Sequence, residues 1–378
     1  MQARALAPLT KAGARRIWLR AQRLDRSAPF GEGPEATRAA VEQLGYVQID
    51  TIHVIERCHH QILYTRIPAY RRADLQRAQS VDKSVFEYWT HALSYVPTRD
   101  LRFYVRAMKE ERRSSSGWFG TVKDAELRKV LARIRKHGAL TIRDIEDDVL
   151  VEKHHAWASR KPSKRALQLA FYRGLVTVSA RSGMLKTYEL MHRHFGWDRL
   201  PKAASEREIL DHLLDRALRS QGVVSVDSAC FMDAPRKAAM RRLIEARVRR
   251  RELVAVEIDR VPHWVRPDDL ESSSPFEERV HVLSPFDPLV AQRRRLKLFF
   301  DYEHRFEAYL PREKRVFGYF AQPVLVGDAI AALIDLKTDR VRRKLLVQKW
   351  TWVSKRERRQ RKRQIEEALH SFERFQLG

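Results

Sequence analysis

Residues 175–190 read Leu175-Val-Thr-Val-Ser-Ala-Arg-Ser-Gly-Met-Leu-Lys-Thr-Tyr-Glu-Leu190. Apolar and polar residues alternate on both sides of Gly183, which predicts a β-hairpin with the glycine in its turn. A helix is expected just before the hairpin, from Pro162 to about Arg173, because proline favours the first turn of a helix. A helix that leads into a two-stranded hairpin is typical of the second half of a winged-helix domain.

The first half of such a domain is recognisable upstream. We expect a helix over about Thr121–His137, a short strand at Leu140 and a second helix near Ile142–Leu150. A hydroxyl residue followed three positions later by an acid satisfies two unpaired amides at a helix start. This capping pattern occurs at Thr121-x-x-Asp124, Thr141-x-x-Asp144 and Ser205-x-x-Glu208.

The same opening occurs three times along the chain: a helical segment ends at a glycine, a short β-branched stretch follows, and a second helix begins. The three glycines are spaced by 93 and 84 residues, which is the size of a winged-helix unit. The copies are Gly45-Tyr-Val-Gln-Ile-Asp-Thr-Ile52, Gly138-Ala-Leu-Thr-Ile-Arg-Asp-Ile145 and Gly222-Val-Val-Ser-Val-Asp-Ser-Ala229.

From about Val280 the sequence pattern becomes typical of β-strands, because short apolar runs are separated by turn residues. These runs are Phe306–Leu310, Arg315–Phe320, Pro323–Val326 and Ala329–Leu336. We therefore expect an α+β fold in which three tandem winged-helix units are followed by a small antiparallel β-sheet or open barrel. The expected boundaries are 1–117, 118–200, 201–270, 271–353 for the β domain and 354–378 for a basic C-terminal helix.

The charge of the chain indicates its partner. The 378 residues carry a formal net charge of +26, which costs self-repulsion unless a polyanion relieves it. No apolar run is long enough to span a membrane, and no lipidation motif is present, so nucleic acid is favoured over a membrane surface. The N-terminus lacks a secretory signal and the only cysteines are Cys58 and Cys230, which predicts a cytoplasmic protein.

Basic residues cluster where a winged helix meets DNA. Arginine and lysine at the start of a recognition helix and on a wing neutralise phosphates, although any single cluster is more often a solvated face. Met184, at the expected wing tip, is a candidate wedge into an opened duplex, whereas Trp118 and Phe119 are expected to pack in a core. The DNA-binding candidates are Arg57, Arg160, Lys161, Ser163, Lys164, Arg165, Arg181, Met184, Lys186, Arg293, Arg294 and Arg295.

The segment Tyr46–Asp50 carries the residues best suited to chemistry. On a strand, Gln48 and Asp50 project from one face while Val47 and Ile49 enter the core. A carboxylate beside an amide suits hydrolysis of an N-glycosidic bond, because the carboxylate stabilises oxocarbenium charge and activates water that the amide orients. The alternative is structural: Asp50 caps a helix over Thr51–Tyr64 and Gln48 decorates the strand.

The stretch from Gly45 to His60 resembles the YcaQ-like (AlkX) DNA glycosylases of the AlkZ-like interstrand-crosslink repair superfamily, whose signature is Gln-apolar-Asp. The related AlkZ branch carries glutamine where this chain has Asp50. The resemblance runs from about Leu9 to Val353, and its further segments are Phe86-Glu-Tyr-Trp-Thr-His-Ala92, Lys161-Pro-Ser-Lys164, Tyr172-Arg-Gly-Leu175, Leu283-Ser-Pro-Phe-Asp-Pro-Leu-Val290 and Lys314-Arg-Val-Phe-Gly-Tyr-Phe320. The basic segment Lys355–Arg363 matches no family feature.

The resemblance implies a C-shaped array of winged helices around a basic channel. It also implies monofunctional removal of N7-alkylguanine from double-stranded DNA, including the unhooking of crosslinks, with Gln48 and Asp50 as the catalytic pair. His91 is a further candidate for contact with a phosphate or the sugar, and a structural histidine is its alternative.

No cofactor is expected, and no metal, because the adjacent His59 and His60 do not form the i, i+4 pair that binds one. The competing interpretation of the whole chain is a non-enzymatic winged-helix regulator, which usually dimerises. Since no heptad or other dimer helix is recognisable, we expect a monomer. A nuclease is a third alternative, but the paired carboxylates that would hold magnesium are not recognisable.

Overall fold

A computed structural model describes residues 7–114, 117, 119–120, 122–145, 150–153, 159–271, 276–353 and 358–378. The chain forms two compact units. The first combines residues 1–71 with 210–378, and the second consists of residues 72–209. The division into five consecutive segments stays a prediction.

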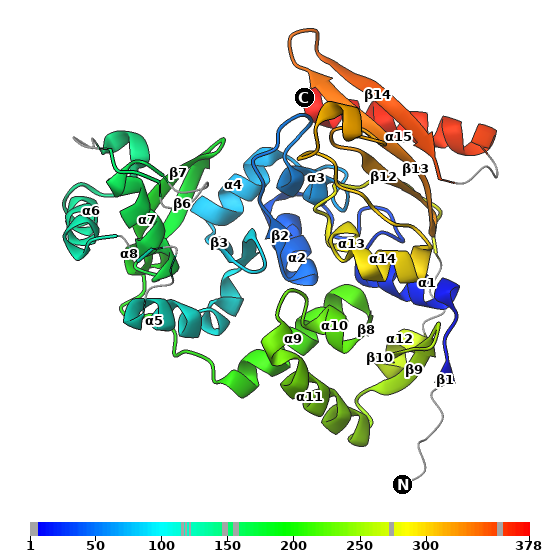
Figure 1. Ribbon diagram of the computed structural model, residues 1–378, viewed down its shortest axis with the longest axis horizontal. Coiled ribbons are helices and arrows are strands. Elements are labelled where there is room, and N and C mark those ends of the chain that lie inside the picture. The colour runs from blue at the N-terminus through cyan, green and yellow to red at the C-terminus, as the bar shows by residue number, and fades with distance from the viewer. Residues whose placement is uncertain are drawn as a thin grey trace. The chain divides into compact units, whose positions relative to one another are not determined.

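The first unit contains both ends of the chain (Figure 1). Its elements up to α10 are β1 (Ala7–Pro8), α1 (Lys11–Ala21), α2 (Gly33–Leu44), β2 (Val47–Gln48), α3 (Cys58–Tyr64), α9 (Glu206–Gln221, from Leu210 on), β8 (Val223–Val224) and α10 (Val226–Ala229). The remaining elements are η3 (Ala234–Arg236), α11 (Lys237–Arg249), β9 (Val254–Ile258), β10 (Val261–Val265), α12 (Pro267–Glu271), β11 (Val280–Val282), α13 (Pro288–Ala291), α14 (Arg293–Phe300), η4 (Arg312–Lys314), β12 (Gln322–Val326), β13 (Ala329–Asp339), β14 (Lys344–Trp352) and α15 (Arg358–Leu377).

The N-terminal helix α1 is held in the first unit by a shared hydrophobic core. Trp18 on α1 is fully buried and meets Phe299 of α14 edge to face, with ring centroids 5.8 Å apart. Val223, Val265 and Leu325 belong to the same cluster, so α1 packs with residues more than 200 positions away in sequence. Burial of these apolar side chains joins the two segments of the unit.

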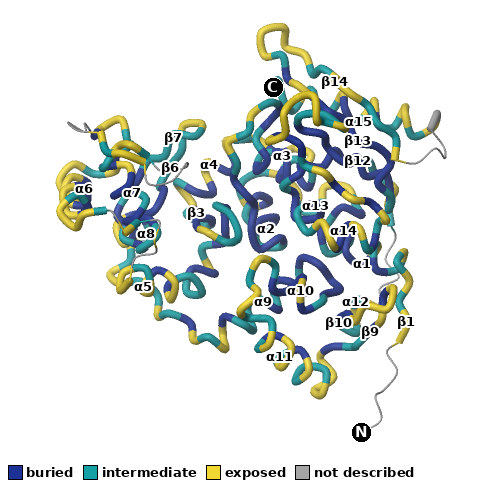
Figure 2. Tube along the Cα trace, in the orientation of Figure 1, coloured by how far each residue is buried: buried dark blue, intermediate teal, exposed yellow. Residues whose placement is uncertain are grey.

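Two four-stranded sheets complete the first unit. β8, α10, α11 and the β9–β10 hairpin repeat the winged-helix order, and β1 adds a parallel strand beside β9 to give the order β1-β9-β10-β8. The second sheet is antiparallel, with the order β11-β12-β13-β14. Strands β12 and β13 are mostly buried (Figure 2), and α15 contributes Ile365, Leu369 and Phe372 to the core beside them.

The second unit contains the winged helix that the sequence predicts most clearly. Its elements are α4 (Arg72–Ser80), β3 (Val85–Trp89), β4 (Leu93–Pro97), η1 (Thr98–Phe103), α5 (Val105–Arg113), α6 (Asp124–His137), β5 (Leu140–Thr141), η2 (Ile142–Asp144), α7 (Pro162–Tyr172), β6 (Val176–Ser182), β7 (Leu185–Leu190) and α8 (Met191–Phe195). The expected second helix near Ile142–Leu150 is wrong in the described residues, because only Ile142–Asp144 forms a short 3-10 turn and neither Ile145 nor Leu150 is helical. α6 and α7 pack together beside the β6–β7 hairpin (Figure 1), and β5 completes a sheet of order β5-β7-β6. Gly183 lies in the turn with φ +60°.

These elements confirm the α+β class and the three predicted helix ends. α2, α6 and α9 each end directly before a glycine with positive φ, and a two-residue strand follows each one. Two capping boxes are confirmed: Thr141 with Asp144, and Ser205 with Glu208, whose carboxylate accepts from the Ser205 amide at 2.8 Å. Trp118, Thr121, Lys355 and Arg356 lie outside the described residues.

Two predicted strands are wrong. Phe306–Leu310 and Arg315–Phe320 form a loop rather than strands. The reason is Glu307, whose carboxylate accepts hydrogen bonds from the backbone amides of Val316, Phe317 and Gly318 and so bends the chain back on itself. Within the described ranges the last sheet stays open, so no closed barrel forms there.

In the part of the chain that the structure describes, none of the helices combines the length and the apolar character needed to cross a lipid bilayer.

Candidate active site

Gly45 places the strand that carries the candidate catalytic residues. It ends α2 with φ +79°, a left-handed conformation that glycine adopts without strain. The side chain of Arg216, on α9, packs against this glycine, and its guanidinium lies 5.9 Å from the ring centroid of Tyr46. A glycine is therefore needed here both for its backbone conformation and for the space that Arg216 fills.

We expect Gly45→Ala to lower the free energy of unfolding by about 1–2 kcal/mol, because alanine is strained at this φ and its methyl group would overlap the Arg216 side chain. Urea denaturation measures the change. Gly31→Ala is the matched control, since Gly31 has φ +75° but no neighbour within 4 Å of an added methyl group. Equal losses in the two variants would show that the Arg216 contact has no energetic importance.

Gln48 and Asp50 follow at and just beyond β2. Val47 and Ile49 are buried, as expected, and Gln48 is buried as well, with 8% of its surface exposed. Asp50 is half-buried. Its Oδ1 atom accepts a hydrogen bond from the Ile52 amide at 2.8 Å, which forms a local turn. Among the described residues no hydrogen bond reaches Oδ2, so this oxygen is available to a ligand.

The expected helix over Thr51–Tyr64 is wrong in its first half, because α3 begins only at Cys58. Residues 51–57 form a loop whose backbone carbonyls accept hydrogen bonds from the end of β13 and from Arg340 just beyond it. The Val54 carbonyl accepts from the Thr338 amide at 2.9 Å, and the Arg340 guanidinium donates to the carbonyls of His53 and Ile55. Asp50 therefore does not cap a helix, and the alternative that gave it this role loses its structural basis.

Two contacts hold α3 in place, one of them at the site, and neither was predicted from the sequence. The Cys58 thiol donates to the Gln48 carbonyl at 3.1 Å, and burial, followed by the nearby Asp50 carboxylate, raises the pKa of this thiol. Just beyond α3, the fully buried Arg66 guanidinium forms a two-pronged ion pair with Asp287, at 2.7 and 3.0 Å. Asp287 lies in the segment Leu283–Val290, which resembles the family, and this resemblance was the only sign in the sequence that Asp287 is important.

The recognition-helix candidates lie at the start of α7 in the second unit. Arg160, Lys161 and Lys164 are exposed, whereas Ser163 and Arg165 are buried. The Nε and Nη2 atoms of Arg165 have no hydrogen-bond partner among the described residues. Arg160, Lys161 and Lys164 therefore stay candidates for contact with DNA phosphates, whereas the buried Arg165 is not accessible to a phosphate.

On the wing, Arg181 is part of an internal ion pair. Its guanidinium donates to both carboxylate oxygens of Glu87, at 2.5 and 2.7 Å, and Glu87 is fully buried. Burial opposes the charge of Glu87, but Arg181 and the more distant Lys186 hold its pKa below the ordinary value. These contacts favour a structural role for Arg181 rather than a phosphate contact.

Lys186 and Met184 lie beside this pair. The Lys186 ammonium lies 3.8 Å from Glu87 and 5.2 Å from the ring centroid of Phe171. Burial, reinforced by Arg181 and Lys164, lowers the pKa of Lys186 to about 8. Met184 is half-buried, and its sulfur lies 3.6 Å from the Arg181 guanidinium.

The remaining candidates divide between the two units. His91 lies in the turn between β3 and β4 of the second unit, and Arg57, in the first unit, precedes α3. Arg293 and Arg294 are exposed at the start of α14. Arg295 is buried, donates to the carbonyls of Gln221 and Val223, and stacks 4.3 Å from the Trp18 ring centroid, which favours a structural role.

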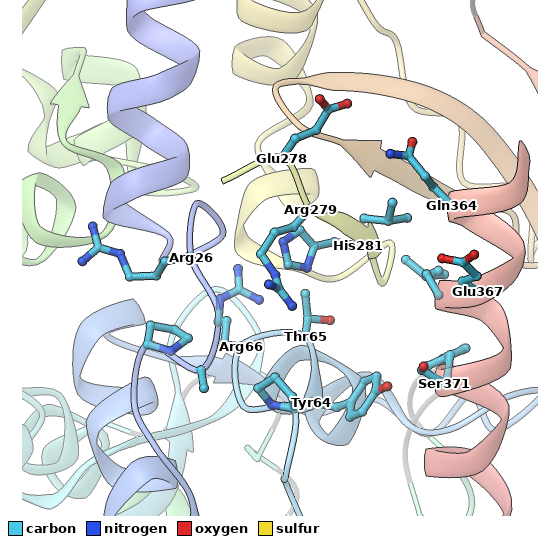
Figure 3. Close-up of a pocket in the computed structure, with 17 residues that line it drawn as sticks. Arg26, Tyr64, Thr65, Arg66, Glu278, Arg279, His281, Gln364, Glu367 and Ser371 are labelled. Carbon is cyan, nitrogen blue, oxygen red and sulfur yellow. The ribbon is translucent and has the colours of Figure 1, made fainter. Parts of the chain in front are cut away.

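A pocket of about 440 Å³ lies elsewhere in the first unit (Figure 3). Arg26, Arg279 and Glu367 line it together with His281, whose ring bonds to the Leu24 carbonyl and whose pKa burial lowers to about 4. The described residues that line this pocket do not include Gln48 or Asp50. Its mixed charges do not select one class of ligand, and the candidate active site is the surface around Asp50.

We also searched the described residues for side chains that could bind a metal ion. Within the described ranges, no group of three or more histidine, cysteine, aspartate or glutamate side chains is arranged to hold a metal ion.

Comparison with known proteins identifies the family and the fold of the chain. Residues 41–375 match the family described as DNA glycosylase AlkZ-like. The solved structure of Streptomyces sahachiroi DNA glycosylase AlkZ is similar to this chain, with a TM-score of 0.61 and 16% sequence identity over 98% of this chain and 97% of that one. The first match shows the family, and the second shows that the fold is shared.

Proposed function

Because the chain belongs to the AlkZ-like family of DNA glycosylases, we propose that it is a metal-independent, monofunctional enzyme that releases N7-alkylated purines from double-stranded DNA. We further propose that it acts as a monomer and unhooks crosslinks formed through such purines. The observation that supports this proposal is the Asp50 carboxylate, half-buried directly after β2, with one oxygen held by the Ile52 amide and the other open to a ligand.

The proposed reaction is a hydrolysis at C1′ of the damaged nucleotide. Alkylation at N7 gives the purine a positive charge, so the electron pair of the breaking C1′–N9 bond neutralises the base as it leaves. Asp50 stabilises the positive charge that develops on the sugar and takes the proton from the attacking water. The Gln48 amide orients this water or the sugar. The products are the free base and an abasic site.

DNA is held by the exposed cations of the chain. Arg160, Lys161 and Lys164 would neutralise phosphates at the start of α7, and Arg293 and Arg294 would do so at the start of α14. His91 would contact the sugar or a phosphate from the β3–β4 turn. Each of these contacts is independent of the base sequence of the DNA, which suits an enzyme that must find rare lesions.

The test is alkaline cleavage of abasic sites in duplex DNA that carries one defined N7-methylguanine. We expect the wild type to release the base equally in EDTA and in magnesium, because the proposed chemistry uses only side chains. Loss of activity in EDTA would contradict metal independence and favour a nuclease-like mechanism. An inactive protein that binds DNA tightly would favour a winged-helix regulator instead.

A further inference from the structure

An exposed tyrosine lies on the loop between α14 and β12. Tyr309 has 72% of its surface in solvent, and its neighbour Leu310 and the nearby Val316 are also exposed. A large aromatic ring that remains this accessible is a common feature of surfaces that bind a ligand.

The loop is braced, so the ring is presented in one place. The buried Glu307 carboxylate accepts from the amides of Val316 at 3.1 Å and Phe317 at 2.7 Å, and its own carbonyl accepts from the Leu310 amide at 3.0 Å. The Arg315 guanidinium donates to the Leu310 carbonyl at 2.8 Å. A contact made by Tyr309 therefore costs little additional ordering of the loop.

This loop and the loop that carries Asp50 pack against the same hydrophobic cluster of the first unit. The Phe306 ring lies 5.6 Å from Tyr309, 5.2 Å from Phe286 and 5.8 Å from Phe320. Ile52, two residues after Asp50, packs against the same hydrophobic cluster. Burial, followed by the Asp50 carboxylate, raises the pKa of the Tyr309 hydroxyl, which agrees with this placement.

We propose that Tyr309 binds the face of the damaged purine while Asp50 acts at C1′ of the same nucleotide. This assignment rests on the proposed function. The purine is attached directly to C1′, so a carboxylate that acts on the sugar carbon has the base as its neighbour. An N7-alkylated purine is a planar cation, and the negative face of an aromatic ring attracts cations. Tyr309 would therefore favour the charged, alkylated base over an undamaged one.

The first experiment measures the single-turnover rate of N7-methylguanine release with enzyme in excess, in the wild type and in Tyr309→Phe, Tyr309→Leu and Tyr309→Ala. We expect the phenylalanine variant to keep the wild-type rate and the other two to lose about ten-fold or more, the size of one base–aromatic contact. Met232→Ala is the matched control, because Met232 is 77% exposed and belongs to the same unit. It should match the wild type.

The second experiment measures binding without turnover. The probe is a duplex that contains a hydrolysis-resistant, 2′-fluorinated N7-methylguanosine, compared with the same duplex undamaged. We expect Tyr309→Leu to lose about ten-fold in affinity for the damaged duplex and nothing for the undamaged one. An inactive wild type would overturn the proposed function itself. An active wild type with Tyr309→Ala or Tyr309→Leu unimpaired would overturn only the aromatic contact.

Discussion

The substitution Asp50→Asn is expected to reduce the rate of base release by at least about 100-fold, the lower range of a general base contribution. Asparagine cannot take a proton from water and carries no charge to stabilise the cationic sugar. Its side-chain oxygen can still accept from the Ile52 amide, so the local turn should persist. The measurement is the single-turnover rate on N7-methylguanine DNA, with the affinity for undamaged duplex as a second readout that should not change.

A matched control for this substitution exists in the same unit. Asp339, at the end of β13, is half-buried and uses its Oδ1 atom in a similar turn, where it accepts from the amides of Val341 and Arg342. Asp339→Asn should keep full activity, since it changes the same charge at another turn. Activity retained in Asp50→Asn, or lost equally in both variants, would refute a catalytic role for Asp50.

The features that the sequence predicted well depend on local chemistry. The helix ends at Gly45, Gly138 and Gly222 are confirmed because a left-handed residue at a helix end favours glycine. The β6–β7 hairpin is confirmed because side chains alternate between two faces and Gly183 suits the turn. Gln48 and Asp50 were singled out by the same alternation, and their catalytic role stays a proposal.

The features that it missed depend on partners far away in sequence. Residues 51–57 have the apolar spacing of a helix, but their backbone is paired with the chain around Thr338 and Arg340. Phe306–Leu310 has the composition of a strand, but the Glu307 carboxylate binds the amides of residues 316–318. Tyr309 was therefore expected within a sheet and gave no sign in the sequence that it would be exposed near Asp50.

Charge clusters were the least informative signal for the same reason. Arg181 and Arg295 lie in basic stretches that resemble DNA contacts, yet Arg181 pairs with Glu87 and Arg295 bonds to backbone carbonyls beside Trp18. Lys161 and Lys164 have equally basic neighbours and remain exposed. Only the fold distinguishes an arginine that stabilises the protein from one that is available to a phosphate.

The largest effect on stability is expected at the buried pair of Arg66 and Asp287. Among the described residues, Asp287→Ala would leave the buried Arg66 guanidinium with only Gln22 and the Ile62 carbonyl as partners. Removing one member of a buried ion pair costs about 3–5 kcal/mol. Asp287 also accepts from the Leu289 amide at the start of α13, which adds to the loss. Urea denaturation should show this decrease in the free energy of unfolding.

Two further variants separate the ion pair from a general sensitivity to mutation. The double variant Arg66→Met/Asp287→Ala removes both charges and should be less destabilised than the sum of the single changes. Glu366→Ala, which breaks the exposed pair with Lys362 on α15, should cost less than about 1 kcal/mol. Arg66 lies two residues after α3, and Cys58 of α3 donates to the Gln48 carbonyl. Loss of the ion pair should therefore also disturb β2. If Asp287→Ala lowered the free energy of unfolding no more than Glu366→Ala does, a stabilising role for the Arg66–Asp287 pair would be contradicted.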